Sequence, residues 1–245
     1  MVSERLFDPE KYMKTNDFRG DGAVLRYIAV ATMFIDHAAL CLVDHIPQAL
    51  YSAGRGIGRI SYPIFAYCLV CGYKHTRDVR RYAARVAIAA LCSEIPYDIM
   101  IRNTVCYMPA QNVMWTMLIG LGMLWGCDRI RLRGPDGRNA TATICPGEKK
   151  ETPGGSAALA RRIYEEHIRW LLLGTGKLAV MAIACLTAQL VRADYGWEGI
   201  AFIAGLSLLP QSLYDIPRGN YPKYLFYAFY PVHMLLLSIV RYALQ

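Results

Sequence analysis

The sequence has few charged residues for its length, because Asp, Glu, Lys and Arg make up 19% of its 245 residues while 55% are hydrophobic. The mean hydropathy is +0.22, and the apolar residues are clustered in long blocks. An ordinary soluble domain of this size is less apolar. The composition therefore excludes such a domain and predicts a polytopic membrane protein.

Signatures of several other protein classes are also missing. The first 22 residues mix acids and bases without an apolar core, so we expect no cleavable signal peptide and expect the first membrane span to direct insertion. The motif "CLVC" at 68–71 has no second ligand pair, which argues against a metal or redox site. The stretch "GTGK" at 174–177 lacks both the upstream glycine and the Ser or Thr of a phosphate-binding loop.

The distribution of positive charge favours a membrane over a nucleic acid as the partner of this chain. The net charge is +8, with a pI of about 9.1. The Lys and Arg residues lie between the apolar blocks and not along one continuous face. Cytoplasmic loops of membrane proteins are enriched in these residues. We therefore expect contact with a lipid bilayer and none with nucleic acid.

Seven apolar blocks predict seven transmembrane helices, since about 20 apolar residues cross the hydrocarbon core of a bilayer. The blocks lie at residues 25–43, 57–72, 82–101, 112–127, 170–191, 196–209 and 224–244. The predicted fold class is therefore an all-α, polytopic helical bundle in the inner or plasma membrane.

Basic residues mark every second interval between these blocks, which predicts a cytoplasmic N-terminus. They cluster before the first block, at 74–81, and in a long loop rich in Gly and Pro. The chain then divides into a cytoplasmic segment 1–24, four helices in 25–127, a basic cytoplasmic loop 128–169 with one helix from Ser156 to His167, and three helices in 170–245.

Asp36 and His37 lie side by side in the middle of the first block. An ionisable side chain at that depth costs about 2.5 kcal/mol or more, so it usually faces a protein interior or a water-filled cavity. His37 follows Arg26 by 11 residues, which places it about 16 Å further along a helix on nearly the same face. One helix face can therefore connect the cytoplasmic surface with a histidine inside the membrane.

Two other blocks carry ionisable residues at a similar predicted depth. Glu94 and Asp98 share one face of the third block, with Pro96 between them, and His233 follows a proline in the last block. A histidine whose tautomer is fixed by a carboxylate suits proton transfer, activation of an amine or hydroxyl, or transient acylation. Each of these residues can instead be a packed structural group, with Glu94 and Asp98 paired to Arg59.

The basic stretch "YKHTRDVRRYAAR" at 73–85 lies at the predicted cytoplasmic end of the bundle. Its charges suit a phosphate-rich cofactor, because Lys and Arg form charge-assisted hydrogen bonds with phosphate. They suit anionic lipid headgroups equally well.

Five motifs along the chain resemble, in order, those of the TraX family, which is named for the conjugative pilin acetylase. They are MFIDH, GRI-x-x-PIFA, SEIPYD, QNV-x-x-T and FYP-x-H. The family is similar to a broader group of transmembrane acyltransferases, one branch of which has an arginine followed, after ten residues, by a catalytic histidine. Arg26 and His37 have that spacing.

The resemblance implies transfer of an acetyl group from cytoplasmic acetyl-CoA, the acyl donor, to an amine or hydroxyl acceptor on a protein or glycan, within or across the membrane. The chain departs from the family pattern in two places. It has less apolar sequence between Tyr195 and Leu213, and the loop 128–169 is longer and more basic. Pilin is therefore not assumed as the acceptor.

The resemblance also implies a role for each candidate residue. His37 would be the general base or transient acetyl carrier, oriented by Asp36, Glu94 or Asp98. The phosphates of the donor would be contacted by Arg26, Lys74, Arg77 and Arg81, with Arg59 as a further candidate on the external side. The acceptor side would be lined by Gln111, Asn112 and His233.

Two other classes of protein fit parts of the sequence. A small proton-coupled transporter would use His37, Glu94 and His233 as a relay, and would be expected to show an internal repeat, which the sequence lacks. A non-enzymatic assembly subunit is the other alternative. Homo-oligomerisation is compatible with all three interpretations.

Overall fold

The structure is a computed structural model that describes residues 22–130, 156–216 and 222–244. Within these ranges the secondary structure is helical, apart from one isolated bridge between Gln111 and Ala193. The predicted all-α class is therefore confirmed. Most of the predicted segment 1–24 and of the loop 128–169 lies outside the described residues.

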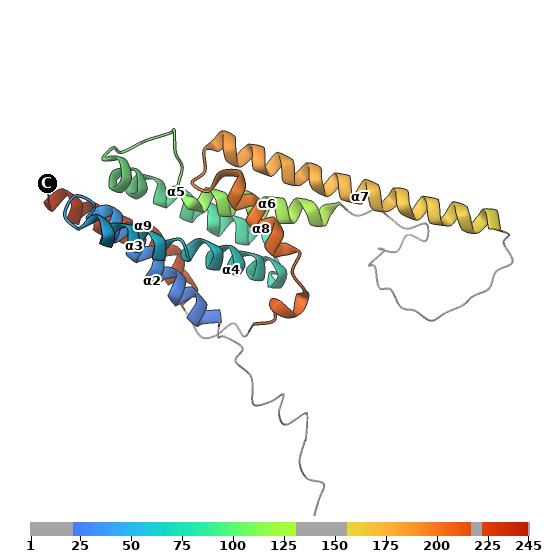
Figure 1. Cartoon of the computed structure of the whole chain (residues 1–245), viewed down its shortest axis with the longest axis horizontal. Coiled ribbons are helices and arrows are strands. Elements are labelled where there is room, and N and C mark those ends of the chain that lie inside the picture. Colours follow the sequence, from blue (N-terminus) through green and yellow to red (C-terminus); the bar gives the residue numbers. More distant parts are fainter. Residues whose placement is uncertain (1–21, 131–155, 217–221, 245) are drawn as a thin grey trace, which may run out of the picture.

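The described α-helices are α2 (Gly22–Cys41), α3 (Gln48–Gly58), α4 (Ser61–His75), α5 (Val79–Arg102), α6 (Val113–Arg129), α7 (Ser156–Val191), α8 (Gly196–Ser207) and α9 (Lys223–Ala243). A short 3₁₀ helix, η1 (Gln211–Leu213), follows α8. Figure 1 shows these elements along the chain.

Polar side chains fix several helix ends. Asp78 is the N-cap of α5 and accepts a hydrogen bond from the backbone N–H of Arg81 at 3.1 Å. Asn103 ends the same helix with a left-handed φ of 54°, which Asn tolerates better than most residues. Asn112 caps α6 by accepting from the backbone N–H of Met114 at 3.0 Å.

Two of the predicted helices have different bounds in the structure. The block 57–72 becomes α4, which is preceded by a separate helix, α3, after a short break at Arg59 and Ile60. The helix predicted from Ser156 to His167 is continuous with the block 170–191, so both form the 36-residue helix α7. The joining stretch 164–172 contains no Gly or Pro that would end the helix, and its Glu, Arg and Leu residues favour helix formation.

Three helices among the described residues are long and apolar enough to cross a membrane: Gly22–Cys41, Tyr164–Val191 and Tyr224–Ala243. They have apolar side chains exposed on the surface of the protein, as expected for contact with lipid. The helices α4, α6 and α8 have 15, 17 and 12 residues, fewer than the about 20 that a perpendicular span needs. The length and composition of these three helices are therefore compatible with a membrane protein.

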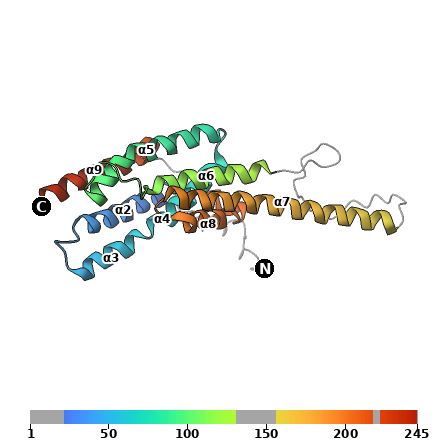
Figure 2. The same ribbon diagram turned by 90° about the horizontal axis from the view of Figure 1, so that it is seen from above.

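Consecutive long helices run in opposite directions through the bundle (Figures 1 and 2). A Cβ at Gly54 of α3 would meet Ala39 of α2, whereas Gly58 lies against Asp36, so α2 and α3 are antiparallel. The contacts of α2 with α9 keep a constant offset of 196 residues, from His37 to His233 and from Cys41 to Leu237, so these two helices are parallel. The start of α2, the end of α4 and the starts of α5 and α9 therefore lie at one end of the bundle.

The helices pack into two groups, each with its own hydrophobic core. The main core is built by α4, α6, α7 and α8, with fully buried side chains at Val70, Leu121, Ile200 and Ile203. A smaller core joins α2, α5 and α9. The first part of α7 projects beyond the end of α6 in both views (Figures 1 and 2).

Candidate functional site

A cavity of about 450 Å³ lies between the two groups of helices. Its lining extends along α2 from Gly22 to His37, which corresponds to about 22 Å of helix. The helices α4, α5, α6 and α9 supply the other walls, together with the turn between α7 and α8. The cavity therefore connects the end of the bundle where α2 starts with the region around His37.

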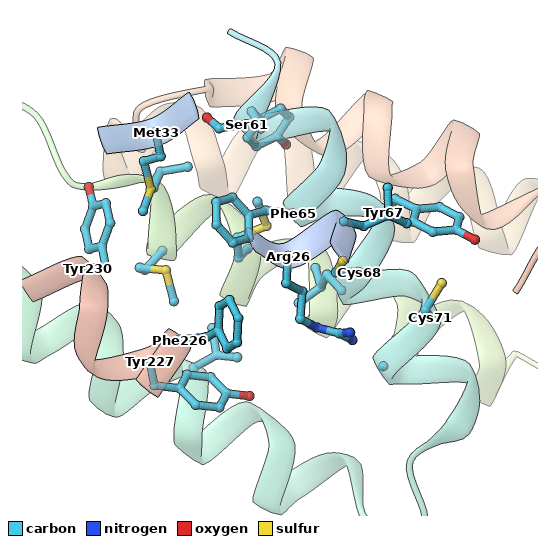
Figure 3. A pocket seen from close by; sticks show the side chains of 18 of the residues that line it. Arg26, Met33, Ser61, Phe65, Tyr67, Cys68, Cys71, Phe226, Tyr227 and Tyr230 are labelled. Atoms are coloured by element: carbon cyan, nitrogen blue, oxygen red, sulfur yellow. The ribbon is translucent and has the colours of Figure 1, made fainter. Parts of the chain in front are cut away.

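The end of the cavity near the start of α2 is basic. Arg26, His75 and Arg85 come from three different helices and line it together. Figure 3 shows the Arg26 side chain reaching between Cys68 and Cys71 on one side and α9 on the other. The Arg26 guanidinium also donates to the carbonyl oxygen of Gly22 at 2.7 Å. Arg26 and Arg85 present two permanent cations to an anionic ligand at this end, whereas His75 has partners of its own: its Nδ1 lies 2.8 Å from the carbonyl oxygen of Cys71 and its Nε2 lies 3.6 Å from Asp215 Oδ1.

Three of the other predicted phosphate-binding residues, Lys74, Arg77 and Arg81, lie at the rim of this basic end and do not line the cavity. All three are exposed: Lys74 in the last turn of α4, Arg77 between α4 and α5, and Arg81 in the first turn of α5. Arg81 is paired with Asp78 at 3.1 Å, and the Lys74 ammonium lies 5.8 Å from the ring centroid of Tyr214. Arg59, the remaining candidate, is the C-cap of α3 and lies just before the start of α4, at the opposite end of α4 from this rim.

His37 lines the cavity near its other end and contacts a second histidine behind it. Its Nδ1 lies 2.7 Å from Nε2 of His233, and the two rings stack with their centroids 5.0 Å apart. His233 is 2% exposed and does not line the cavity. Its Nδ1 lies 2.7 Å from the carbonyl oxygen of Phe229. Tyr230 packs edge-on against both imidazole rings.

Asp36 also lines the cavity, but it is paired with an arginine of α3. Its Oδ2 accepts a hydrogen bond from Arg55 at 2.7 Å, while its Oδ1 is buried and has no hydrogen-bond partner within the described residues. Asp36 therefore makes no contact that would orient the neighbouring His37 ring. That contact comes from His233, which the sequence had placed on the acceptor side.

The turn between α7 and α8 completes this end of the cavity. Tyr195 stacks on Tyr62 with ring centroids 3.8 Å apart, and the Arg59 guanidinium lies 6.0 Å from the Tyr195 ring. Burial, and then the charge of Asp194, raise the pKa of the Tyr195 hydroxyl, which therefore stays protonated at neutral pH. The Tyr62 hydroxyl is buried and, like Asp36 Oδ1, lacks a partner in the described part of the chain.

Comparison with known proteins identifies the region that contains most of this site. Residues 21–136 match the family model described as TraX protein. This stretch, called the TraX region below, is therefore similar to the TraX family. The matched region includes α2 to α6, and with them Arg26, Asp36 and His37, whereas His233 lies outside it. The predicted resemblance is therefore confirmed for this part of the chain.

A stretch of 104 residues is 26% identical to the probable fimbrial assembly protein FimC, serogroup H1, of Dichelobacter nodosus. The similarity covers 40% of this chain and 42% of that relative, so it spans less than half of either protein. No solved structure shows significant similarity to the chain.

The TraX region also contains the carboxylates of the third predicted block, and the structure gives them partners other than His37. Glu94 Oε2 accepts hydrogen bonds from the side chains of Asn112 and Trp115, the latter at 3.0 Å. Asp98 Oδ2 accepts from the backbone N–H of Tyr107 at 2.6 Å. Neither residue lines the cavity. The predicted orientation of His37 by Glu94 or Asp98 therefore has no supporting contact, and Glu94 does not join the two histidines as the relay of a transporter would require.

Gln111 and Asn112 of the TraX region lie at the start of α6, outside the lining of the cavity. The backbone N–H of Gln111 donates a hydrogen bond to the carbonyl oxygen of Arg192 at 3.0 Å, and its side-chain amide donates to the carbonyl oxygen of Met108 at 3.1 Å. The fully buried Asn112 donates to the carbonyl oxygen of Ala90 at 2.9 Å as well as to Glu94. These contacts join α5, α6 and the turn after α7. Gln111 and Asn112 therefore stabilise the packing of the helices around the cavity and do not line it.

Four residues that line this cavity or contact its lining were not predicted from the sequence: Arg55, Arg85, Asp194 and Tyr230. Arg85 carried a usable signal, because it ends the basic stretch and lies about one turn after Arg81 on the same helix. The partner of Arg55 depends on the hairpin that brings α3 back along α2, and no local pattern encodes that pairing. Among the described residues, no group of three or more His, Cys, Asp or Glu side chains is arranged to hold a metal ion.

Proposed function

We propose that this protein is a membrane-embedded acyltransferase that moves an acetyl group from cytoplasmic acetyl-CoA to an amine or hydroxyl acceptor within or across the membrane. The observation that carries the proposal is the single cavity that has Arg26, His75 and Arg85 at one end and His37 at the other. A donor with a charged nucleotide and a long neutral arm needs both an anion-binding entrance and a reactive group at a distance.

The residues at the basic end fit the phosphates of acetyl-CoA. Arginine binds phosphate through charge-assisted hydrogen bonds, and Arg85 and Arg26 reach the cavity from facing helices. His75 would add a third donor only by exchanging its contact with Asp215 for one with a phosphate. The exposed Lys74, Arg77 and Arg81 at the rim raise the local positive potential, which attracts an anionic ligand to the entrance. When bound, acetyl-CoA supplies the activated acetyl group as a thioester.

His37 is the residue proposed to act on the reacting groups. As a general base it would remove the proton from the attacking amine or hydroxyl, and then return that proton to the departing thiolate sulfur of the donor. As an acetyl carrier its ring nitrogen would attack the thioester carbonyl and later release the acetyl group to the acceptor. Both routes consume one thioester and one acceptor N–H or O–H, and both produce one acetylated acceptor and one free thiol.

The acceptor is proposed to enter at the end of the cavity near Asp36. Asp36 Oδ1 is a buried hydrogen-bond acceptor without a partner in the described residues, so a ligand that donates an N–H or O–H would stabilise it. The Tyr62 hydroxyl lies in the lining of the same cavity and offers a donor for a carbonyl group. The relative that is named for fimbrial assembly favours a protein acceptor over a glycan.

We further propose that the basic end of the cavity faces the cytoplasm and that the chain is a multi-pass protein of the cell membrane. The basic residues of the turn between α4 and α5 lie at the same end of the bundle as the start of α2 and the end of α6. Such residues accumulate on the cytoplasmic side. The donor would then be drawn from the cytoplasmic pool.

The test is the consumption of two donors by the purified protein in detergent: acetyl-CoA, and acetyl-pantetheine, which has the thioester arm without the nucleotide and its phosphates. We expect free thiol to be released from acetyl-CoA, and acetyl-pantetheine to show a KM higher by roughly 100-fold, as expected for the loss of two or more charge-assisted contacts. Equal KM values for both donors would contradict the proposal that the basic end of the cavity binds the phosphates of acetyl-CoA. Release of no thiol from either donor, with a mixture of amine and hydroxyl acceptors present, would contradict the proposed activity.

A further inference from the structure

The two histidines at the end of the cavity have different surroundings. His37 lines the cavity, whereas His233 lies behind it and is almost fully buried. The ring of His233 stacks on that of Phe229, with the two centroids 4.5 Å apart. The ring centroid of Phe34 lies 6.3 Å from that of His233. This aromatic packing holds the plane of the His233 ring and allows it to present one nitrogen to His37.

The hydrogen bonds of the pair determine which nitrogen carries each proton. The carbonyl oxygen of Phe229 can only accept, so the Nδ1 atom of His233, 2.7 Å away, must carry a hydrogen. In the neutral ring the Nε2 atom of His233 then has a free lone pair. The Nδ1 atom of His37, 2.7 Å from that lone pair, must therefore be the donor. Neutral His37 is left with its own lone pair on Nε2.

The surrounding charges favour this neutral pair over a charged one. An imidazolium inside an apolar bundle is costly unless a carboxylate compensates for it. The carboxylates nearest in sequence or helix register have other partners: Asp36 is paired with Arg55, Glu94 with Asn112 and Trp115, and Asp98 with the backbone of Tyr107. Two neutral rings with one shared hydrogen bond are the arrangement that satisfies both of them.

We propose that His233 is a positioning residue that fixes His37 in the tautomer with an unprotonated Nε2, the nitrogen left available to the cavity. This inference rests on the proposed function, because it assigns the reactive atom of the proposed base or acetyl carrier. When Nε2 of His37 takes a proton or an acetyl group, the positive charge on the ring is stabilised through the hydrogen bond from Nδ1 to His233. His233 itself touches neither donor nor acceptor.

Two substitutions of His233 separate positioning from simple packing. In His233→Gln the amide group reaches the place of Nε2, so its oxygen can still accept from His37 Nδ1. In His233→Asn the shorter amide reaches only the place of Nδ1, so the bond to Phe229 can persist while the bond to His37 is lost. Both variants introduce an amide of similar polarity, and a merely structural role would not distinguish them at equal melting temperature.

The first measurement is ¹⁵N NMR of protein labelled at histidine, in detergent at neutral pH, with the His37 signals assigned by their loss in His37→Asn. We expect His37 to show a protonated Nδ1 and an unprotonated Nε2 in the wild type and in His233→Gln, and a mixture of tautomers in His233→Asn. A proton on Nε2 of His37 in the wild type would overturn the inference, whatever the activity of the protein.

The second measurement is the steady-state release of thiol from acetyl-CoA. We expect kcat to fall by about 100-fold in His233→Asn, because this variant loses both the fixed tautomer and the hydrogen bond that stabilises the charged His37 ring; a histidine held wholly in the wrong tautomer costs up to about 10⁴-fold. We expect kcat to fall by less than about 10-fold in His233→Gln, and KM for the donor to be unchanged in both variants. Equal kcat values in the two variants would contradict the positioning role. If the wild type releases no thiol, the proposed function fails, and the NMR result still decides the tautomer.

Discussion

Gly58 of α3 lies directly against Asp36 of α2. A Cβ atom at Gly58 would come within 2.2 Å of the Asp36 Cβ and 2.3 Å of its Oδ1. Close approach of helix backbones at small residues is common in membrane proteins. Here it also places Arg55, one turn earlier on α3, 2.7 Å from Asp36 Oδ2. The glycine therefore sets the position of the carboxylate that precedes His37.

The first prediction is that Gly58→Ala destabilises the protein and impairs the site. The added methyl group has to displace Asp36 or separate α2 from α3, and overpacking of this kind costs about 1 to 3 kcal/mol. Gly56→Ala on the same helix is the matched control, since a Cβ there has no atom within 4 Å. We expect a lower melting temperature and lower thiol release for Gly58→Ala alone, and equal melting temperatures for the two variants would contradict the tight contact.

The second prediction concerns two arginines one turn apart at the start of α5. Arg85 lines the cavity, whereas Arg81 is exposed at its rim and paired with Asp78. We expect Arg85→Ala to weaken acetyl-CoA binding by about 10- to 100-fold, because a hydrogen bond to a charged group contributes about 1.5 to 3 kcal/mol. Arg81→Ala should weaken it much less. Isothermal titration calorimetry on the protein in detergent measures both.

Salt dependence provides a control for the same measurement. The affinity of the wild type should decrease as ionic strength rises, and that decrease should be smaller in Arg85→Ala, since one phosphate contact has been removed. If binding is unaffected by either arginine and by salt, the basic stretch 73–85 is better explained by contact with anionic lipid headgroups.

The third prediction is that Glu94 supports the fold and not the reaction. Glu94→Gln retains an oxygen that can accept from Asn112 and Trp115, so we expect a small change in melting temperature and thiol release in proportion to folded protein. Glu94→Leu leaves the Trp115 indole N–H and one of the two N–H groups of the Asn112 amide without a partner, at a cost of about 1 to 3 kcal/mol each, while Asn112 keeps its bond to Ala90. A folded Glu94→Gln variant with a kcat reduced 100-fold would instead assign this carboxylate to the chemistry.

The fourth prediction is the orientation of the bundle. Cys106 is exposed on the turn between α5 and α6, and Thr76 lies on the turn between α4 and α5, at the other end of α5. With the other native cysteines replaced, an impermeant maleimide should label Cys106 in intact cells. It should label a Thr76→Cys variant, with Cys106 also replaced, only after the membrane is opened. The reverse pattern would place the basic end of the cavity outside the cell and contradict a cytoplasmic donor.

Sequence patterns identified the helix face that carries the site. The 11-residue spacing of Arg26 and His37 depends only on helix geometry, and both residues line one cavity. The all-helical class followed from the length and polarity of the apolar blocks. These features are local, so they are readable without knowledge of the packing.

The partners of the ionisable residues were not predictable in the same way. The Asp36 carboxylate is adjacent to His37 in sequence. It forms an ion pair with Arg55 because the hairpin brings α3 back alongside α2. Glu94 shares a face with Asp98, but the start of α6 supplies the side chains that cover it. His233 lies 196 residues from His37 and reaches it only because α9 runs parallel to α2. Each partner depends on tertiary packing that no local pattern contains.

The fifth prediction is that His37→Ala abolishes acetyl transfer while the protein stays folded and still binds acetyl-CoA. Loss of a general base typically costs about 10² to 10⁴ in rate, and loss of a covalent carrier can cost more. Binding should persist because the phosphates would be held by Arg26 and Arg85, at the other end of the cavity. Thiol release from acetyl-CoA, calorimetric binding and melting temperature should be recorded on the same preparations.

His37→Asn separates chemistry from packing at this position. Its amide occupies the place of the imidazole Nδ1 and can still donate to His233, so we expect it to recover the stability that His37→Ala loses without recovering turnover. A histidine that served only packing would give the opposite result, with turnover following the amount of folded protein in both variants. Near-normal turnover in His37→Asn would therefore exclude His37 as the reacting residue, since an amide nitrogen can neither accept the proton nor carry the acetyl group at neutral pH.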